Sequence, residues 1–304
     1  MPISVSKGRK DMDLIRFPEM SRGNLRAMRQ TVDGAFRDFT RAWGDTLEAI
    51  FAPLQSLLTF IENLLIRSPW IAVLAVLAAG IWLVSRSWKI ALGSVLALLV
   101  VGYFGMWEDT MRTIAMVAVC TLIAVVLGIP VGILMAQSNR MNAMVTPILD
   151  MMQTMPSFVY LIPVVMIFGL GKVPGLIAVV IYAIPPVIRL TNLGIRQVAP
   201  DVLEAAEAFG SSSWQKLRDV QLPLALPTIM AGINQTIMMS LAMVVVASMI
   251  GVRGLGQPVL QAINQQYFTM GVMNGLAIVA IAIIMDRTTQ AYGKRLQKHT
   301  EAGK

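Results

Sequence analysis

A stripe of polar residues interrupts one of the apolar segments of this chain. Spaced at i, i+3, i+4 and i+7, its members are Asp150, Gln153, Thr154 and Ser157. A helix would place them on one face, and Pro156 would disrupt the backbone beside them. Because a carboxylate facing lipid is costly, we expect the stripe to face protein or a water-filled path. Two roles stay open: packing between helices, with Arg140 or Arg189 as ion partner, or lining of a pathway.

A second polar group lies in a later apolar segment that is rich in methionine. The polar members are Asn234, Gln235, Thr236 and Ser240, and the methionines are Met230, Met238, Met239, Met243 and Met249. Methionine is flexible and can repack as helices move, which suits a gate. The same residues are explained equally well as filling of a core.

The longest polar interruption of the second half is residues 201–223. Asp201 followed by Glu204 predicts a capping box at the start of a short helix, and Gly210 is placed to end that helix in a left-handed conformation. Ser212 followed by Gln215 predicts a second short helix, running to Leu222-Pro223. The predicted unit is thus a helix, a glycine elbow and a helix between two apolar spans.

The first of these short helices has two different faces. Helical spacing places Val202, Ala205, Ala206 and Phe209 on one face, opposite Glu204 and Glu207. The two small alanines beside Phe209 would let the backbone of a partner approach closely. A rigid elbow would then transmit a push into the span that follows.

This stretch resembles the cytoplasmic coupling loop of ABC importer permeases. The residues that carry the resemblance, and that it assigns to ATPase coupling, are Glu204, Ala205, Ala206, Phe209, Gly210, Leu222 and Pro223. Three further blocks, at 149–163, 185–191 and 246–251, are similar to the permeases of glycine betaine, proline betaine or choline importers. The resemblance covers roughly residues 70 to 290.

The resemblance implies a set of partners and a mechanism. Two ATP-binding subunits inside would hold ATP and Mg, a substrate-binding protein would act outside, and two copies of the permease would surround one path. The chain itself would need no cofactor and would be a transport subunit, moving a quaternary amine osmolyte by alternating access across a bacterial plasma membrane. Affinity for the cation would reside mainly in an aromatic cage of the binding protein.

An autonomous secondary transporter or channel is the alternative. In that reading Asp150 would be the ion site and no ATPase would be needed. The chain has no Gly-x-x-x-x-Gly-Lys-Ser/Thr phosphate loop of its own, and its single histidine, His299, lies in the terminal tail. The coupling pattern favours the ATP-driven permease.

Composition places the chain among membrane proteins. Hydrophobic residues make up 56% of its 304 residues and charged residues only 14%, with a mean hydropathy of +0.67, too apolar for a soluble domain of this length. The net charge of +8 falls at the ends and between spans, which indicates orientation in a membrane and no nucleic acid. The single cysteine, Cys120, is expected to be a small buried side chain, and no metal-ligand or catalytic cluster is visible.

The first 68 residues divide into two segments. Residues 1–32 carry ten charges, predicting a basic tail with little fixed structure and no cleaved signal peptide. Residues 33–68 have apolar side chains at helical spacing from Phe36 to Leu64, predicting an amphipathic helix that restarts at Pro53. Its acidic residues argue against a spanning role. We expect it to lie in the membrane interface rather than against the transmembrane body, although both fit.

The remainder predicts an all-α polytopic membrane protein with about seven transmembrane helices. The apolar spans are at 69–86, 88–107, 110–136, 144–170, 173–190, 223–250 and 269–286. Residues 69–107 would be two peripheral helices, flanked by interfacial aromatics. Residues 108–290 would be the permease core, with the coupling loop at 200–222, and 291–304 a basic tail; the resemblance implies a type I importer core of five helices. Small-residue pairs at Gly128 and Gly132 and at Gly271 and Gly275 would allow close helix contacts.

Charge distribution predicts the orientation. Positive residues gather on the side of the coupling loop and the C-terminus, which we place in the cytoplasm. Seven spans then leave the N-terminus outside. The basic tail opposes this only weakly, since Arg67 is the one cation within about 20 residues of the first span.

Overall fold

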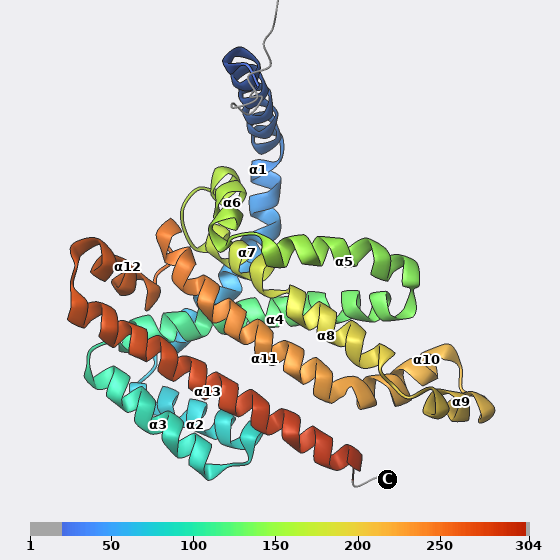
Figure 1. The fold of residues 1–304 in the computed structure, drawn as a ribbon. Helices are drawn as coiled ribbons and strands as arrows, with labels where there is room; N and C mark the ends of the chain where they lie inside the picture. Colours follow the sequence, from blue (N-terminus) through green and yellow to red (C-terminus); the bar gives the residue numbers. More distant parts are fainter. Residues whose placement is uncertain (1–19, 302–304) are drawn as a thin grey trace, which may run out of the picture. The chain divides into compact units, whose positions relative to one another are not determined.

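The structure is a computed structural model that describes residues 20–301, with side chains as far as Arg295. Every regular element within that range is helical, as the predicted all-α class requires (Figure 1). The chain divides into two compact units, one that ends at Leu47 and one that begins at Glu48. Each unit is described by itself.

The first unit contains the beginning of helix α1 (Arg22–Arg67). The Ser21 hydroxyl accepts the N–H of Asn24 at 3.3 Å and so caps this end. The prediction of little fixed structure is therefore wrong for residues 22–32, because arginine, methionine, alanine and glutamine favour helix despite their exposure. Residues 1–19 of the predicted tail lie outside the described residues. The helix also runs through Pro53 without the predicted restart.

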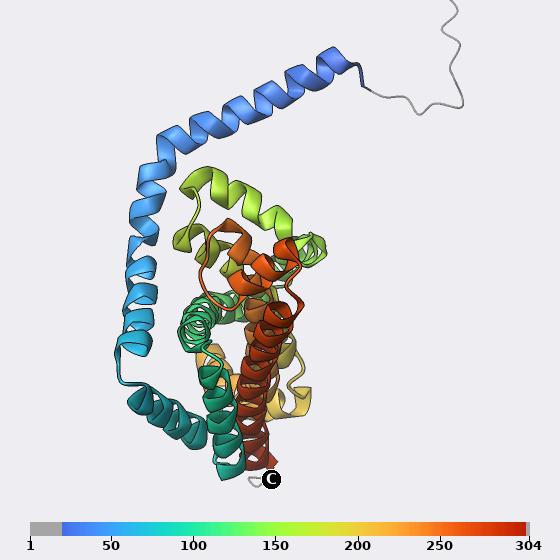
Figure 2. The same ribbon diagram turned by 90° about the vertical axis from the view of Figure 1, so that its left-hand side faces the viewer.

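The second half of α1 packs against the rest of the second unit (Figure 2). Leu58 is fully buried, and the Phe51 ring meets Phe168 edge-on, with 5.6 Å between centroids. Glu62 forms an ion pair with Lys172. Our preference for the interface is thus not supported for residues 51–65, which pack on the transmembrane body. The helix is also long and apolar enough to be a candidate span, since the charge of Glu62 is compensated by its partner.

Helices α2 (Trp70–Ser85) and α3 (Trp88–Tyr103) form a hairpin beside α13. Each has 16 residues, about 24 Å at 1.5 Å per residue, which is short of a ~30 Å hydrocarbon core. Both are apolar, and Trp70, Trp88 and Tyr103 at their ends are exposed. They match the two predicted peripheral helices in place and character, but are shorter than predicted.

Long helices form the body of the second unit. These are α4 (Trp107–Gln137), α7 (Lys172–Ala183) followed directly by α8 (Pro185–Arg196), α11 (Leu222–Ala247) and α13 (Phe268–Glu301). With α1, they supply the five helices of the described chain that are long and apolar enough to cross a membrane, or six if one bent pair is a span. The multi-pass prediction is confirmed, with a different allotment of spans at the N-terminal end.

The predicted fourth span, 144–170, is the bent pair. Helix α5 (Asn139–Thr154) ends before Met155 and Pro156, a 3₁₀ turn (Ser157–Tyr160) follows, and α6 (Leu161–Phe168) leaves at 109° to α5. A residue before proline is pushed out of the helical region, and Met155 is extended, with ψ 133°. The predicted disruption at Pro156 is confirmed, whereas one continuous helix over this range is wrong.

Glycines on α4 allow the closest helix contact of the body. A Cβ on Gly128 would lie 2.5 Å from Cγ1 of Val187, and one on Gly132 would lie 2.7 Å from the carbonyl oxygen of Ile188. The Gly128 and Gly132 pair therefore lets α8 approach α4, as the spacing predicted. The second predicted pair behaves differently, because nothing lies within 4 Å of a Cβ on Gly275.

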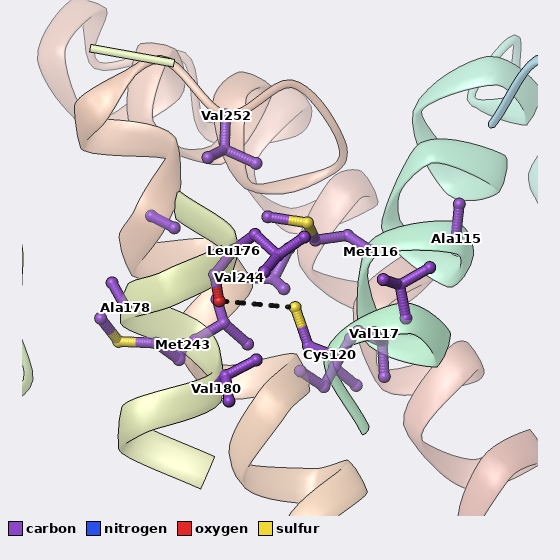
Figure 3. Close-up of a cluster of buried hydrophobic side chains, with 14 of the residues drawn as sticks. Ala115, Met116, Val117, Cys120, Leu176, Ala178, Val180, Met243, Val244 and Val252 are labelled. Carbon is purple, nitrogen blue, oxygen red and sulfur yellow. Dashed lines mark hydrogen bonds between the residues drawn. The ribbon is translucent and has the colours of Figure 1, made fainter. Parts of the chain in front are cut away.

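The largest apolar core joins α4, α7 and α11, and Figure 3 shows its centre. Cys120, Met243 and Ala178 are fully buried there. The Cys120 thiol donates to the carbonyl oxygen of Leu176 at 3.8 Å, a weak hydrogen bond between α4 and α7 (Figure 3). Cys120 is thus a buried packing residue, as expected from its apolar neighbours.

Candidate coupling loop and polar clusters of the spans

The coupling loop begins with helix α9 (Pro200–Ala208). Its N-cap is Ala199, which makes no side-chain cap bond, and Pro200 occupies the first turn. The predicted capping box of Asp201 and Glu204 is therefore wrong: proline, which has no N–H to satisfy, starts the helix one residue earlier. Asp201 lies in the first turn instead, where a carboxylate still interacts favourably with the helix dipole.

Only one side of α9 is covered by the chain itself. Ala206 is buried and Leu203 is half-buried. Val202, Ala205 and Phe209 are exposed, and Phe209 is 92% exposed. The predicted apolar face is therefore split: Ala206 holds α9 on the body, whereas Phe209 and Ala205 present an apolar surface without a partner in the described chain.

The elbow has the predicted glycine. Gly210 is left-handed, with φ +78°. Its N–H donates to the Glu207 carbonyl at 2.9 Å, and the Ser211 N–H donates to the Ala206 carbonyl at 3.0 Å, the two bonds of a Schellman motif. The predicted termination of the helix at Gly210 is confirmed.

The second predicted capping box is present. The Ser212 hydroxyl accepts the Gln215 N–H at 3.3 Å, and the Gln215 side chain accepts the Ser212 N–H at 2.8 Å. Helix α10 (Ser213–Gln215) begins here. An ion pair between Lys216 and Glu207 ties it to α9, so the two short helices are held as one unit.

The helix that begins at α10 does not end at Leu222-Pro223, contrary to the prediction. A π-helical segment (Lys216–Gln221) carries it directly into α11. The wider π turn makes room for the ring of Pro223 and for the carbonyl that its missing N–H cannot bond. Leu217 is buried with Ile195 and Ile229. The loop is thus mechanically continuous with the span after it and packed against α8.

A side-chain network that sequence reasoning missed fixes the other entrance to the loop. Arg196, at the end of α8, donates to the Met135 carbonyl at 2.8 Å, to Asn139 at 2.9 Å and to Asn192 at 2.9 Å. Asn192 in turn donates to Asn142 at 2.8 Å. Arg196 was noted only as a positive charge beside the loop; its position just before Pro200, among several asparagines, was the available signal.

The structure places the polar stripe of α5 at the surface of the single chain. Asp150 forms an ion pair with Arg189 of α8, one of its two predicted partners. Gln153 and Thr154 are exposed and Ser157 is half-buried. The Thr154 hydroxyl donates to its own helix, to the Asp150 carbonyl at 3.0 Å. Packing describes Asp150, whereas Gln153 and Thr154 face outward from this chain.

Asn234 belongs to a cluster that joins α11 to α13. Its amide donates to Asp286 at 2.8 Å, and it accepts from the Thr289 hydroxyl at 2.8 Å. Gln290 also donates to Asp286, at 2.7 Å. Met238 is half-buried. Asp286 was not singled out from the sequence, because its partners lie more than 50 positions away.

These features define a class of protein: a multi-pass helical membrane protein with a rigid, capped loop that offers an apolar surface on one side. Residues 128–298 match the family described as "Binding-protein-dependent transport system inner membrane component". The chain belongs to this family and is the permease subunit of an ABC importer.

Curated relatives cover most of the chain. It is 48% identical over 229 residues to the glycine betaine/carnitine transport permease protein GbuB of Listeria monocytogenes, which covers 75% of this chain and 81% of that protein. It is 45% identical over 247 residues to the glycine betaine/proline betaine permease ProW of Escherichia coli, covering 81% and 70%. It is 45% identical over 251 residues to the glycine betaine permease OpuAB of Bacillus subtilis, covering 83% and 89%.

A solved structure has a related fold. The methionine ABC transporter MetNI, in an inward-facing conformation, aligns with a TM-score of 0.56 and 21% identity, over 60% of this chain and 92% of that chain. This supports the type I importer fold.

Proposed function

We propose that this permease imports a quaternary amine osmolyte, glycine betaine or a close relative such as proline betaine or choline. The support is that relatives at 45 to 48% identity carry glycine betaine in their names. The structure contributes the coupling side of the proposal. Its single most informative observation is the exposed Phe209 on a loop that is capped, ion-paired and continuous with α11.

The coupling surface is proposed to dock on a separate ATPase subunit. Ala205 and Phe209 form its apolar part, and Glu204 is exposed beside them. Gly210 sets the elbow, while Leu222 and Pro223 pass the movement into the span. ATP and Mg would bind to two copies of the partner, and two copies of the permease would enclose the path. A binding protein outside would deliver the substrate.

The autonomous transporter with an ion site at Asp150 is less well supported. Its carboxylate is already compensated by Arg189, and an ion site requires a carboxylate whose charge is available to the ion.

The orientation we propose places the coupling loop and the C-terminus in the cytoplasm and the N-terminus outside. The ion pair between Glu62 and Lys172 supports it. Lys172 begins α7, whose continuation α8 ends near the loop, so the second half of α1 contacts the opposite, external end of the body.

Reconstitution tests the function. The permease is placed in proteoliposomes with an ATPase subunit of its own class and with a glycine betaine binding protein, and uptake of labelled glycine betaine is measured. We expect uptake that requires ATP, the ATPase and the binding protein. Uptake by the permease alone, driven by a proton or sodium gradient, would establish the alternative instead.

A further inference from the structure

The antiparallel packing of α3 against α13 leaves two hollows that meet. One, of about 280 Å³, is lined by Lys89 and Arg287. The other, of about 570 Å³, is almost entirely apolar and reaches Phe104. Ala97 of α3 and Ala280 of α13 line both hollows. The two small side chains keep the space open, so the hollows form one groove between these helices.

The groove is basic at one end only. Lys89 stands at the start of α3, and Arg287 lies four turns along α13 from Met273, which lines the far end with Phe104. In Figure 1, α13 begins beside α12 and runs toward the side of α9 and α10. The two cations therefore lie toward the coupling-loop side, and the apolar part extends away from it.

Neither cation is compensated within the described part of the chain. Lys89 and Arg287 are exposed and take part in no ion pair among the described residues. Asp286, the neighbour of Arg287, accepts from Asn234 and Gln290 instead. Two positive charges at one hollow attract an anion, and the groove beyond them attracts a hydrocarbon.

The dimensions fit one lipid leaflet. Half of a ~30 Å hydrocarbon core is about 15 Å, or ten residues of helix. Counted from Lys89, ten residues reach just past Ala97, where the two hollows meet. An acyl chain lying along the groove would place its phosphate beside the two cations.

We propose that this groove is a binding site for an anionic phospholipid, with the phosphate held by Lys89 and Arg287 and one acyl chain lying along Ala97 and Ala280. Under the proposed orientation the lipid belongs to the cytoplasmic leaflet. The site rests on the groove and its charges and would stand even if the transported substrate differed.

Native mass spectrometry of the purified full-length permease tests the headgroup. Phosphatidylglycerol and phosphatidylcholine of equal chain length are titrated separately. We expect the parent to bind the first phosphatidylglycerol about tenfold more tightly than phosphatidylcholine, and the K89Q/R287Q variant to bind both alike. The matched control, R140Q/R253Q, also removes two exposed cations but away from the groove, and should keep the parent's preference.

The acyl-chain part has its own variant. Ala280→Leu fills the groove while leaving both cations, and it should weaken the binding of both lipids several-fold. Inorganic phosphate at millimolar concentration should not displace the lipid. The proposal is overturned if the parent shows no preference, if the control loses as much as K89Q/R287Q, or if phosphate competes. It is also overturned if Ala280→Leu changes the oligomeric state but not lipid binding, which would make the groove a contact between copies.

Discussion

At the scale of single residues, polar side chains within the spans serve mainly to join helices. Asp150 pairs with Arg189, and Asn234 bonds with Asp286 and Thr289. Both clusters link elements that are distant in sequence. A buried or membrane-facing charge whose partner is removed is far more costly than an intact pair, so these residues act as pairs and not as isolated sites.

For Asp150 we expect a difference between two substitutions. Asp150→Asn keeps hydrogen bonding to Arg189 and should retain at least about half of the parent's uptake. Asp150→Leu leaves the arginine without an acceptor and should lower the yield of folded protein several-fold. The yield is measured by size-exclusion chromatography of the solubilised permease.

The double variant Asp150→Leu/Arg189→Leu provides the control, since removing both partners should restore much of the yield. If Asp150→Asn folds normally but abolishes uptake, the carboxylate is instead an ionised pathway residue.

A second expectation concerns Phe209. It is 92% exposed, so Phe209→Ala should leave the melting temperature of the isolated permease unchanged. An aromatic anchor at an interface is commonly worth about 2 kcal/mol or more, so affinity for the ATPase subunit should fall about thirtyfold. The matched control is Phe268→Ala, which removes an 81% exposed phenylalanine at the opposite end of the body. Equal effects of the two variants would remove Phe209 from the proposed interface.

At the scale of elements, the outcome depended on whether the signal was local. Gly210 and the Ser212–Gln215 box were predictable because a cap is decided by the few residues around it. The Asp201 box failed because Pro200 offered a competing start. The continuation of α10 into α11 could not be predicted, since a π turn at Pro223 depends on how Leu217 packs against α8.

The contact between α4 and α8 gives a prediction at this scale. Gly132→Ala would place a Cβ 2.7 Å from the Ile188 carbonyl oxygen and 2.6 Å from Cβ of Thr191, so the helices must separate. Overpacking of this kind costs about 1 to 3 kcal/mol, and the melting temperature should fall by several degrees.

Gly80→Ala on α2 is the matched control, because nothing lies within 4 Å of the added Cβ. It should leave the melting temperature unchanged or raise it slightly, since alanine is the better helix former. A Gly132→Ala protein as stable as the parent would show that the α4–α8 contact is looser than described.

At the scale of the whole molecule, composition predicted the membrane class and the multi-pass fold, because the apolar fraction follows directly from the solvent that the helices face. The number of spans was harder. Glu62 made α1 look too polar to pack on the body, and only its pairing with Lys172, 110 positions away, removes that objection. Sequence distance hid the decisive contact.

The proposed orientation can be measured on intact cells. In a Cys120→Ala background, which removes the only cysteine, Ser6→Cys should react with an impermeant thiol reagent once any outer membrane is permeabilised. Ser211→Cys, in the exposed elbow, is the control and should react only after lysis. Protection of position 6 until lysis would place the N-terminus inside and make α1 an additional crossing.

The central claim is that the Gly210 elbow couples ATP hydrolysis to transport, and Gly210→Val tests it most directly. A branched residue at φ +78° is strained by at least about 1 to 2 kcal/mol, which should misalign Phe209 while the spans still fold. Gly105→Val is the matched control, because Gly105 has φ +77° and equally open surroundings but lies at the other end of α3.

The measurement is ATP hydrolysis by reconstituted complexes, with and without substrate-loaded binding protein, alongside uptake. We predict normal abundance for both variants, with stimulation of hydrolysis and uptake lost in Gly210→Val and retained in Gly105→Val. Stimulated hydrolysis and uptake at the parent's level in Gly210→Val would contradict the account.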